Sequence, residues 1–195
     1  MGRIPRRDPF VIVITGSECT GKSAVARGLA AHLDAPYSGE FVREYLDLKG
    51  SALEASDVEP IARGQIAAED AAIARARAIV VKDTDLLSTV VYARHYYGAC
   101  PAWVEEAALA RAGAFYLLLQ PDLPWVADGQ RDRPHARDEM HALFRDALLA
   151  AGVTFVEVGG VGEARLRSAI QHVEASLAHA PGFCITKNTY PYEPE

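Results

Sequence analysis

Apolar residues follow two patterns that alternate along the chain. Short runs that are apolar almost throughout are typical of strands covered on both faces. We expect such strands at Phe10–Thr15, Ala78–Lys82, Phe115–Leu119 and Val153–Val158, with a short extended piece at Pro36–Ser38. Elsewhere apolar residues recur every three or four positions, which predicts amphipathic helices. These are expected at Ser23–Leu33, Phe41–Leu48, from Ser56 or Asp57 to Ala76, at Asp85–Tyr97, Pro101–Arg111 and Asp138–Ala151, and around Leu166, Ile170, Val173 and Leu177.

The alternation predicts an α/β fold with an open parallel sheet and helices on both faces. A length of 195 residues suits one domain. We expect this domain over residues 10–180, a flexible N-terminal tail over 1–9 and an extended C-terminal tail over 181–195. Within the domain, the polar segment at about 121–137 is rich in proline and charge, and we expect it to form a lid.

Composition excludes several classes of protein. The net charge of −6 argues against a broad surface for nucleic acid or anionic membranes, because both require clustered positive charge. We find no apolar run near the length of a membrane span and no secretory signal. Cys19, Cys100 and Cys184 are far apart and odd in number, which is typical of a reducing cytoplasm. We therefore expect a cytoplasmic protein.

A phosphate-binding motif follows the first predicted strand. The segment reads G-x-x-x-x-G-K-S, in which backbone N–H groups wrap nucleotide phosphates and the next helix directs its positive end at them. Its lysine reaches the β- and γ-phosphates, and its serine offers a hydroxyl to Mg²⁺. The residues predicted to bind ATP here are Gly16, Ser17, Glu18, Cys19, Thr20, Gly21, Lys22 and Ser23.

Acidic residues follow the neighbouring predicted strands. Asp83 comes directly after an apolar strand, where phosphate-loop enzymes hold Mg²⁺, so Ser23 and Asp83 form the predicted metal site. Asp85 is expected to face the acceptor. Glu40 and Arg43 lie three residues apart at the start of a helix, so both side chains can project on the same side. A kinase needs a carboxylate to deprotonate the acceptor hydroxyl and a cation to neutralise the transferring phosphoryl group, and these two residues would supply them.

The lid segment supplies further cations and a ring. Arg131 and Arg133 are expected to neutralise charge on the phosphates when the lid closes. Trp125 could stack on a base, or it could anchor the hinge of the lid. Tyr92 could line the acceptor pocket, although an aromatic helix face in the core is the commoner case.

The motifs G-S-E-C-T-G-K-S, E-F-V-R-E-Y, D-T-D and P-W-V-A-D-G-Q-R, in this order, resemble the ribosylnicotinamide kinase domain of the bacterial trifunctional NAD-biosynthesis regulators and of stand-alone relatives. The resemblance covers roughly Phe10–Val158. It implies a phosphate-loop kinase fold and transfer of the ATP γ-phosphoryl group to the 5′-hydroxyl of nicotinamide riboside. The partners implied are ATP with Mg²⁺ and this nucleoside.

The resemblance also implies roles for single residues. The catalytic residues would be Lys22, Glu40, Asp83 and Arg131, and those binding the acceptor would be Glu40, Phe41, Arg43, Asp85, Tyr92 and Trp125. Glu40 is the preferred base and Asp85 the second choice. The family often has an aromatic residue where this chain has Gly39, so Tyr92, Phe41 or Trp125 would have to cover the nicotinamide ring.

Two other functions stay open at this stage. One is a kinase of the same architecture for another nucleoside or nucleotide, and the other is a nucleotide-binding switch that hydrolyses ATP. No nucleotidylyl-transfer motif or helix-turn-helix segment precedes the kinase motifs, so we expect neither NAD synthesis nor operator binding. The sequence leaves the oligomeric state open, homo-oligomers included.

Overall fold

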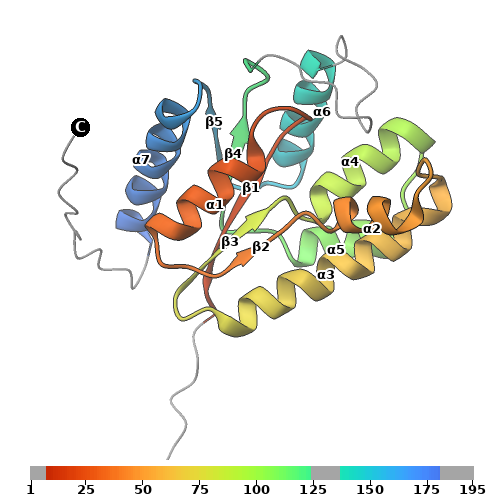
Figure 1. Cartoon of the computed structure of the whole chain (residues 1–195), viewed down its shortest axis with the longest axis horizontal. Helices are drawn as coiled ribbons and strands as arrows, with labels where there is room; N and C mark the ends of the chain where they lie inside the picture. The colour runs from red at the N-terminus through yellow and green to blue at the C-terminus, as the bar shows by residue number, and fades with distance from the viewer. Residues whose placement is uncertain (1–7, 124–136, 181–195) are drawn as a thin grey trace, which may run out of the picture.

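The structure is a computed structural model that describes residues 8–123 and 137–180. A parallel sheet occupies the centre of the molecule, with helices on both of its sides (Figure 1). In chain order the elements are β1 (Phe10–Thr15), α1 (Lys22–His32), β2 (Tyr37–Ser38), α2 (Phe41–Lys49), the 3₁₀ turn η1 (Ala55–Asp57), α3 (Val58–Arg75), β3 (Ile79–Asp83), α4 (Leu86–Tyr97), α5 (Ala102–Ala110), β4 (Phe115–Leu119), α6 (Arg137–Ala150), β5 (Phe155–Val158) and α7 (Glu163–His179).

The five described strands run parallel in the order β2-β3-β1-β4-β5. The central strand β1 pairs with β3 on one side and β4 on the other, so that Ile14 lies level with Asp83 and Leu117. Carboxyl ends of neighbouring parallel strands meet at one edge of the sheet, which is where ligands bind in open α/β folds. The phosphate motif after β1 and the acid at the end of β3 are therefore adjacent.

Each face of the sheet is covered by its own set of helices. Alternate residues of β1 and β4 point to opposite faces, because side chains alternate along a strand. On one face α1 and α7 pack against the sheet; this core includes Ile12, Ile14, Val25, Leu29, Leu117, Leu119, Val173 and Leu177. On the other face α3, α4, α5 and α6 cover it; this core includes Val13, Ala62, Val90, Val104, Tyr116, Leu118, Phe144 and Leu148.

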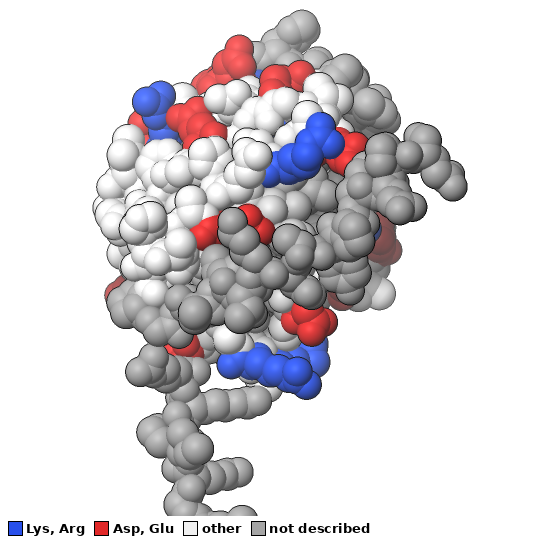
Figure 2. Space-filling model, turned by 90° about the vertical axis from the view of Figure 1, so that its left-hand side faces the viewer, with Lys and Arg blue, Asp and Glu red and all other residues white. Residues whose placement is uncertain are grey.

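The predicted fold class is confirmed, and the four apolar runs are strands whose ends lie within two residues of those expected. The predicted domain boundaries stay predictions, since 1–7 and 181–195 lie outside the described residues, as do residues 124–136 of the expected lid. No helix among the described residues is long and apolar enough to cross a membrane. On the face drawn in Figure 2, the described acidic and basic side chains are interspersed among neutral ones, without a broad basic surface.

Candidate active site

The loop between β1 and α1 contains two glycines whose backbone conformations disfavour a side chain. Gly16 has a φ of 133°, and a Cβ there would lie 2.9 Å from the carbonyl oxygen of Leu119 on β4. Gly21 has a φ of 79° and is the N-cap residue of α1. Neither position suits a residue with a side chain, which explains why both glycines of the motif are needed.

Lys22 lies buried inside this loop. Its Nζ donates hydrogen bonds to the carbonyl oxygens of Gly16 at 3.0 Å and Ser17 at 2.9 Å. The loop is also braced by the Thr20 hydroxyl, which donates to the Ser17 carbonyl oxygen at 2.9 Å. Helix α1 has no side-chain cap and no acidic residue in its first turn, so its N-terminal N–H groups and partial positive charge are directed at the loop. The arrangement is an anion site for phosphates.

Asp83 ends β3 beside this loop. Its Oδ2 accepts a hydrogen bond from the Tyr37 hydroxyl at 3.1 Å, whereas its buried Oδ1 has no hydrogen-bond partner among residues 8–123 and 137–180. Burial raises the pKa of Asp83, and the Ser23 hydroxyl and the Lys22 ammonium oppose that shift. A buried carboxylate oxygen without a partner, next to a serine hydroxyl, suits a hard cation such as Mg²⁺. The pair Ser23 and Asp83 therefore fits the predicted metal site.

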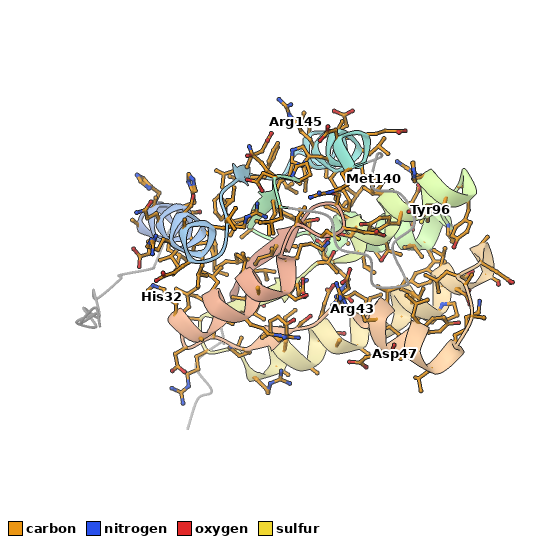
Figure 3. The ribbon with its side chains drawn as sticks, turned by 45° about the horizontal axis from the view of Figure 1, so that its top comes forward. His32, Arg43, Asp47, Tyr96, Met140 and Arg145 are labelled. Atoms are coloured by element: carbon orange, nitrogen blue, oxygen red, sulfur yellow. The ribbon has the colours of Figure 1, made fainter. Side chains whose placement is uncertain are left out.

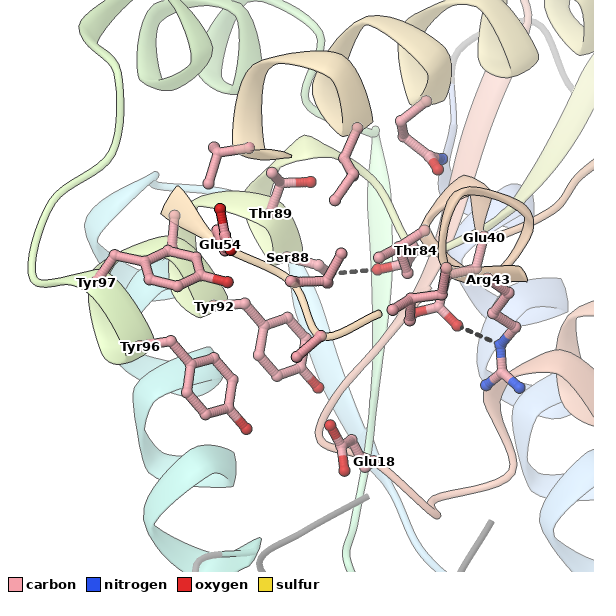
Figure 4. A pocket seen from close by; sticks show the side chains of 18 of the residues that line it. Glu18, Glu40, Arg43, Glu54, Thr84, Ser88, Thr89, Tyr92, Tyr96 and Tyr97 are labelled. Carbon is pink, nitrogen blue, oxygen red and sulfur yellow. Dashed lines mark hydrogen bonds and ion pairs between the residues drawn. The ribbon is translucent and has the colours of Figure 1, made fainter. Parts of the chain in front are cut away.

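A cavity of about 750 Å³ opens from the phosphate loop toward α2, α3 and α4 (Figure 4). Polar residues of the loop and of the α2 start lie at one end of it, and tyrosines of α4 lie at another side. Arg43 and Tyr96 come from helices on two sides of this space (Figure 3). The lining includes Glu18, Lys22, Glu40, Arg43, Glu54, Gln65, Thr84, Ser88, Thr89, Tyr92, Tyr96 and Tyr97.

Three of the five charged residues that line the described part of the cavity are acidic. Glu40 Oε2 accepts a hydrogen bond from Arg43 Nε at 2.7 Å, and the Glu40 side chain is only 11% exposed. Its charge, with that of Glu18, adds to the burial that raises the pKa of the Tyr92 hydroxyl well above its usual value. A carboxylate is thus paired with a guanidinium in the wall of the cavity that Glu18 and Lys22 of the phosphate loop also line.

Two of the cavity tyrosines are stacked, and the third is tilted against one of them. The Tyr92 and Tyr96 rings are nearly parallel, with centroids 6.1 Å apart, and the Tyr92 and Phe144 rings form a T-shaped pair with centroids 5.4 Å apart. Tyr92 thus lines the cavity, and Tyr96 and Tyr97, which the sequence reasoning did not select, line it too. These rings offer flat apolar surface for a base.

Asp85 differs from the expectation that it faces the acceptor. It is the N-cap of α4, with Oδ1 accepting from the Leu87 backbone N–H at 3.1 Å and Oδ2 accepting from the Tyr116 hydroxyl at 2.6 Å. It is 2% exposed and does not line the cavity. The chain turns at Thr84, which has a φ of 70°, and this turn directs Asp85 into the protein interior.

Phe41 also differs from its expected place at the acceptor. Its ring packs against Gly64 of α3, where an added Cβ would overlap the ring, and it is not among the residues that line the cavity. Trp125, Arg131 and Arg133 lie outside the described residues, so their predicted roles stay predictions.

Arg165 of α7 is a residue of the site that sequence reasoning missed. This buried guanidinium donates to the carbonyl oxygens of Thr20 in the phosphate loop, of Gly160 at 2.6 Å and of Gln120 at 3.3 Å. It also pairs with Asp122, just after β4. Arg165 therefore ties the phosphate loop to the ends of two other strands. Its partner in the loop lies 145 residues away along the chain, so no local pattern indicates it.

A model of a family of AAA domains matches residues 11–165, most of the chain. The chain belongs to this AAA domain family. The structure places it among the phosphate-loop NTPases, since the G-x-x-x-x-G-K-S loop joins the central parallel strand to the following helix.

The trifunctional NAD biosynthesis/regulator protein NadR of Escherichia coli strain K12 is 30% identical over 153 residues, and the Salmonella typhimurium protein of the same name is 29% identical over 153 residues. Each match covers 75% of this chain and 37% of the relative. The chain thus spans little more than a third of the length of these relatives. The resemblance to the trifunctional regulators predicted from the motifs is confirmed.

Solved structures agree with this placement. A NadR protein in complex with NAD and AMP-PNP has a TM-score of 0.71 at 25% identity, covering 87% of this chain and 50% of that one. A NadR protein in complex with NR has a TM-score of 0.73 at 24% identity, covering 87% and 51%. Thymidylate kinase from Ehrlichia chaffeensis has a TM-score of 0.64 at 12% identity, covering 88% and 100%, and shares the fold.

Proposed function

We propose that this protein is an ATP-dependent kinase that phosphorylates the 5′-hydroxyl of nicotinamide riboside and yields nicotinamide mononucleotide. The observation that carries the proposal is the cavity that begins at Lys22 of the phosphate loop and is lined by Glu40 and by the α4 tyrosines. One space thereby joins a phosphate site, a carboxylate and an aromatic wall. The similarity to NadR proteins, one of them bound to NR and another to AMP-PNP, supports the same assignment.

The phosphoryl transfer follows from this arrangement. The acceptor oxygen attacks the γ-phosphorus, the bond from that phosphorus to the β-phosphate oxygen breaks, and ADP leaves. Glu40 orients the hydroxyl and accepts its proton, while Arg43 holds the Glu40 carboxylate at 2.7 Å. Lys22 and the α1 N-terminus stabilise the negative charge of the phosphates.

Mg²⁺ would be held by the Ser23 hydroxyl and by Asp83, whose Oδ1 has no hydrogen-bond partner in the described part of the chain. When bound, the ion neutralises charge on the β- and γ-phosphates. Tyr37 fixes the other oxygen of Asp83, so that carboxylate keeps one orientation. We assign Arg131 and Arg133 to the lid, as the sequence predicts.

The charge of the cavity favours a nucleoside over a nucleotide as acceptor. Glu18, Glu40 and Glu54 line the described part of it, while Lys22 is bonded to loop carbonyls and Arg43 to Glu40. A phosphate on the acceptor would be repelled by these carboxylates. Nicotinamide riboside carries a positive charge on its ring instead, and a cation is attracted both to carboxylates and to the faces of aromatic rings.

The test is a measurement of ADP release by the purified protein with Mg·ATP and a panel of acceptors. The panel contains nicotinamide riboside, the common nucleosides and their monophosphates. We expect nicotinamide riboside to give the fastest release and the monophosphates to give the background rate. Release no faster with nicotinamide riboside than without an acceptor would refute the proposal, and a faster pyrimidine nucleoside would replace it with another nucleoside kinase. Release that needs no acceptor at all would indicate an ATPase switch.

A further inference from the structure

The start of α2 is capped in an unusual way. Glu40 is the N-cap residue, but its side chain makes no hydrogen bond to the helix backbone and instead bonds Arg43 at the cavity. N-cap side chains commonly satisfy the first free N–H groups of a helix. Here the N–H of Phe41 donates to Oε1 of Gln65 on α3, at 2.9 Å. The first free N–H of α2 is thus satisfied from another helix, while the Glu40 carboxylate stays at the cavity with Arg43.

Gln65 is itself held in one orientation. It is 2% exposed, and its Nε2 donates to Oε1 of Glu69, one turn along α3, at 3.4 Å. The other oxygen of Glu69 pairs with Lys82 on β3 at 2.7 Å, and both of these side chains are almost fully buried. Because the carboxylate takes the donor end of the amide, the acceptor end is directed at Phe41. A buried polar network of this kind holds its members rigidly when every member has a partner.

The neighbouring residue, Gly64, receives the side chain of the same Phe41. An added Cβ at Gly64 would overlap the Phe41 ring. Glycine inside a helix destabilises it by about 1 kcal/mol relative to alanine, and Gly64 lies in the middle of the 18-residue helix α3. The space that it leaves allows α2 to approach α3 closely. Two consecutive residues of α3 therefore fix both the backbone and the side chain of Phe41.

We propose that Gly64 and Gln65 form a seat on α3 that positions Glu40 for the acceptor hydroxyl. Phe41 follows Glu40 directly, so a shift of Phe41 moves the carboxylate with it. Displacements near 1 Å are enough to lower the rate of a reaction by about 100-fold. Gly64 and Gln65 are positioning residues, and this role rests on the proposed kinase activity, in which Glu40 is the base.

The first experiment replaces the capping amide. In Gln65→Leu we expect kcat for nicotinamide riboside to fall by about 10- to 100-fold, with the KM for ATP unchanged, because the phosphate loop keeps its own contacts. The matched control is Gln171→Leu, on the exposed side of α7. A kcat for Gln65→Leu equal to that of the control would overturn the seat, and so would a loss confined to the KM for ATP.

The second experiment separates positioning from direct contact with the acceptor, since Gln65 lines the cavity whereas Gly64 and Phe41 do not. Gly64→Ala should lower kcat because the methyl group displaces the Phe41 ring. Adding Phe41→Leu removes the ring atoms that the methyl group would overlap. The kcat of the double variant should therefore be at least about threefold higher than that of Gly64→Ala alone. Additive losses in the double variant would contradict the seat.

A third measurement does not depend on activity. Amide exchange followed by NMR should show the Phe41 N–H exchanging about tenfold faster in Gln65→Leu than in Gln171→Leu, because the hydrogen bond to Oε1 is lost. Equal exchange would overturn the seat. If the wild-type protein transfers no phosphate to any nucleoside while exchange at Phe41 changes as expected, the proposed function is wrong. The positioning of a catalytic base is then wrong too, although the hydrogen bond from Phe41 to Gln65 is confirmed.

Discussion

Replacing Asp85 with asparagine should make stability less dependent on pH. Burial raises the pKa of this carboxyl from 3.8 to about 6, and the nearby Glu69 charge adds to the shift. The Tyr116 hydroxyl, the Lys82 ammonium and the Leu87 backbone N–H oppose it. An asparagine keeps an oxygen that can accept from Leu87 N–H at the start of α4 but cannot ionise.

The direction and the size of the change in unfolding free energy with pH follow from the pKa of Asp85 in the folded and unfolded states. Because the folded protein holds the proton more tightly than the unfolded chain, ionisation costs the folded state free energy, and stability falls as the pH rises from about 4 to about 6. One pKa unit corresponds to about 1.4 kcal/mol, so the full shift is worth about 3 kcal/mol. About 2 kcal/mol of it lies between pH ~4.5 and pH ~7.5, because an unfolded aspartate is already largely ionised at the lower value.

The assay is urea unfolding of wild type and Asp85→Asn at these two pH values. Relative to wild type, the variant should gain about 2 kcal/mol of unfolding free energy on going from the lower to the higher pH. Titrations shared by both proteins cancel in this comparison. Asp47→Asn, at an exposed position on α2, controls for the loss of one carboxylate. A difference that does not change with pH, or one that Asp47→Asn reproduces, would refute the role of burial at Asp85.

Substitutions at Glu40, Asp83 and Arg165 test the roles of these residues in the site. Glu40→Gln should lower kcat by about 10²–10⁴-fold, whereas Asp85→Asn should retain most of it; steady-state kinetics that give the reverse order would exchange their roles. Asp83→Asn should raise the Mg²⁺ concentration for half-maximal rate by about 10- to 100-fold, and an unchanged Mg²⁺ titration would remove Asp83 from the metal site. Arg165→Met should raise the KM for ATP by about tenfold, because the phosphate loop loses its brace; an unaltered KM in a folded variant would contradict that brace.

Much of the fold could be predicted because its signals are local. A buried strand such as β1 consists almost entirely of apolar residues, and the glycines and lysine of the phosphate loop have fixed spacing. Asp83 could be placed because it follows an apolar run. These features depend on residues that are neighbours in the sequence.

The remainder of the site depends on contacts between distant segments. Asp85 lies only two residues beyond Asp83, but the turn at Thr84 makes it a buried helix cap, and one turn residue of positive φ is not evident from a hydrophobic pattern. Arg165 and Gln65 belong to helices whose sequences read as ordinary amphipathic segments. Their partners, Thr20 and Phe41, become visible only when the helices are packed.

The most direct test of the proposed kinase activity follows a labelled phosphoryl group. ATP labelled at the γ-position is incubated with the protein, Mg²⁺ and nicotinamide riboside, and the products are separated. We expect the label in nicotinamide mononucleotide, on the 5′-oxygen, and its transfer should be abolished in Lys22→Ala although circular dichroism shows that variant folded. Label found only in inorganic phosphate, or transfer that survives in Lys22→Ala, would contradict phosphoryl transfer from this loop to a nucleoside in the adjoining cavity.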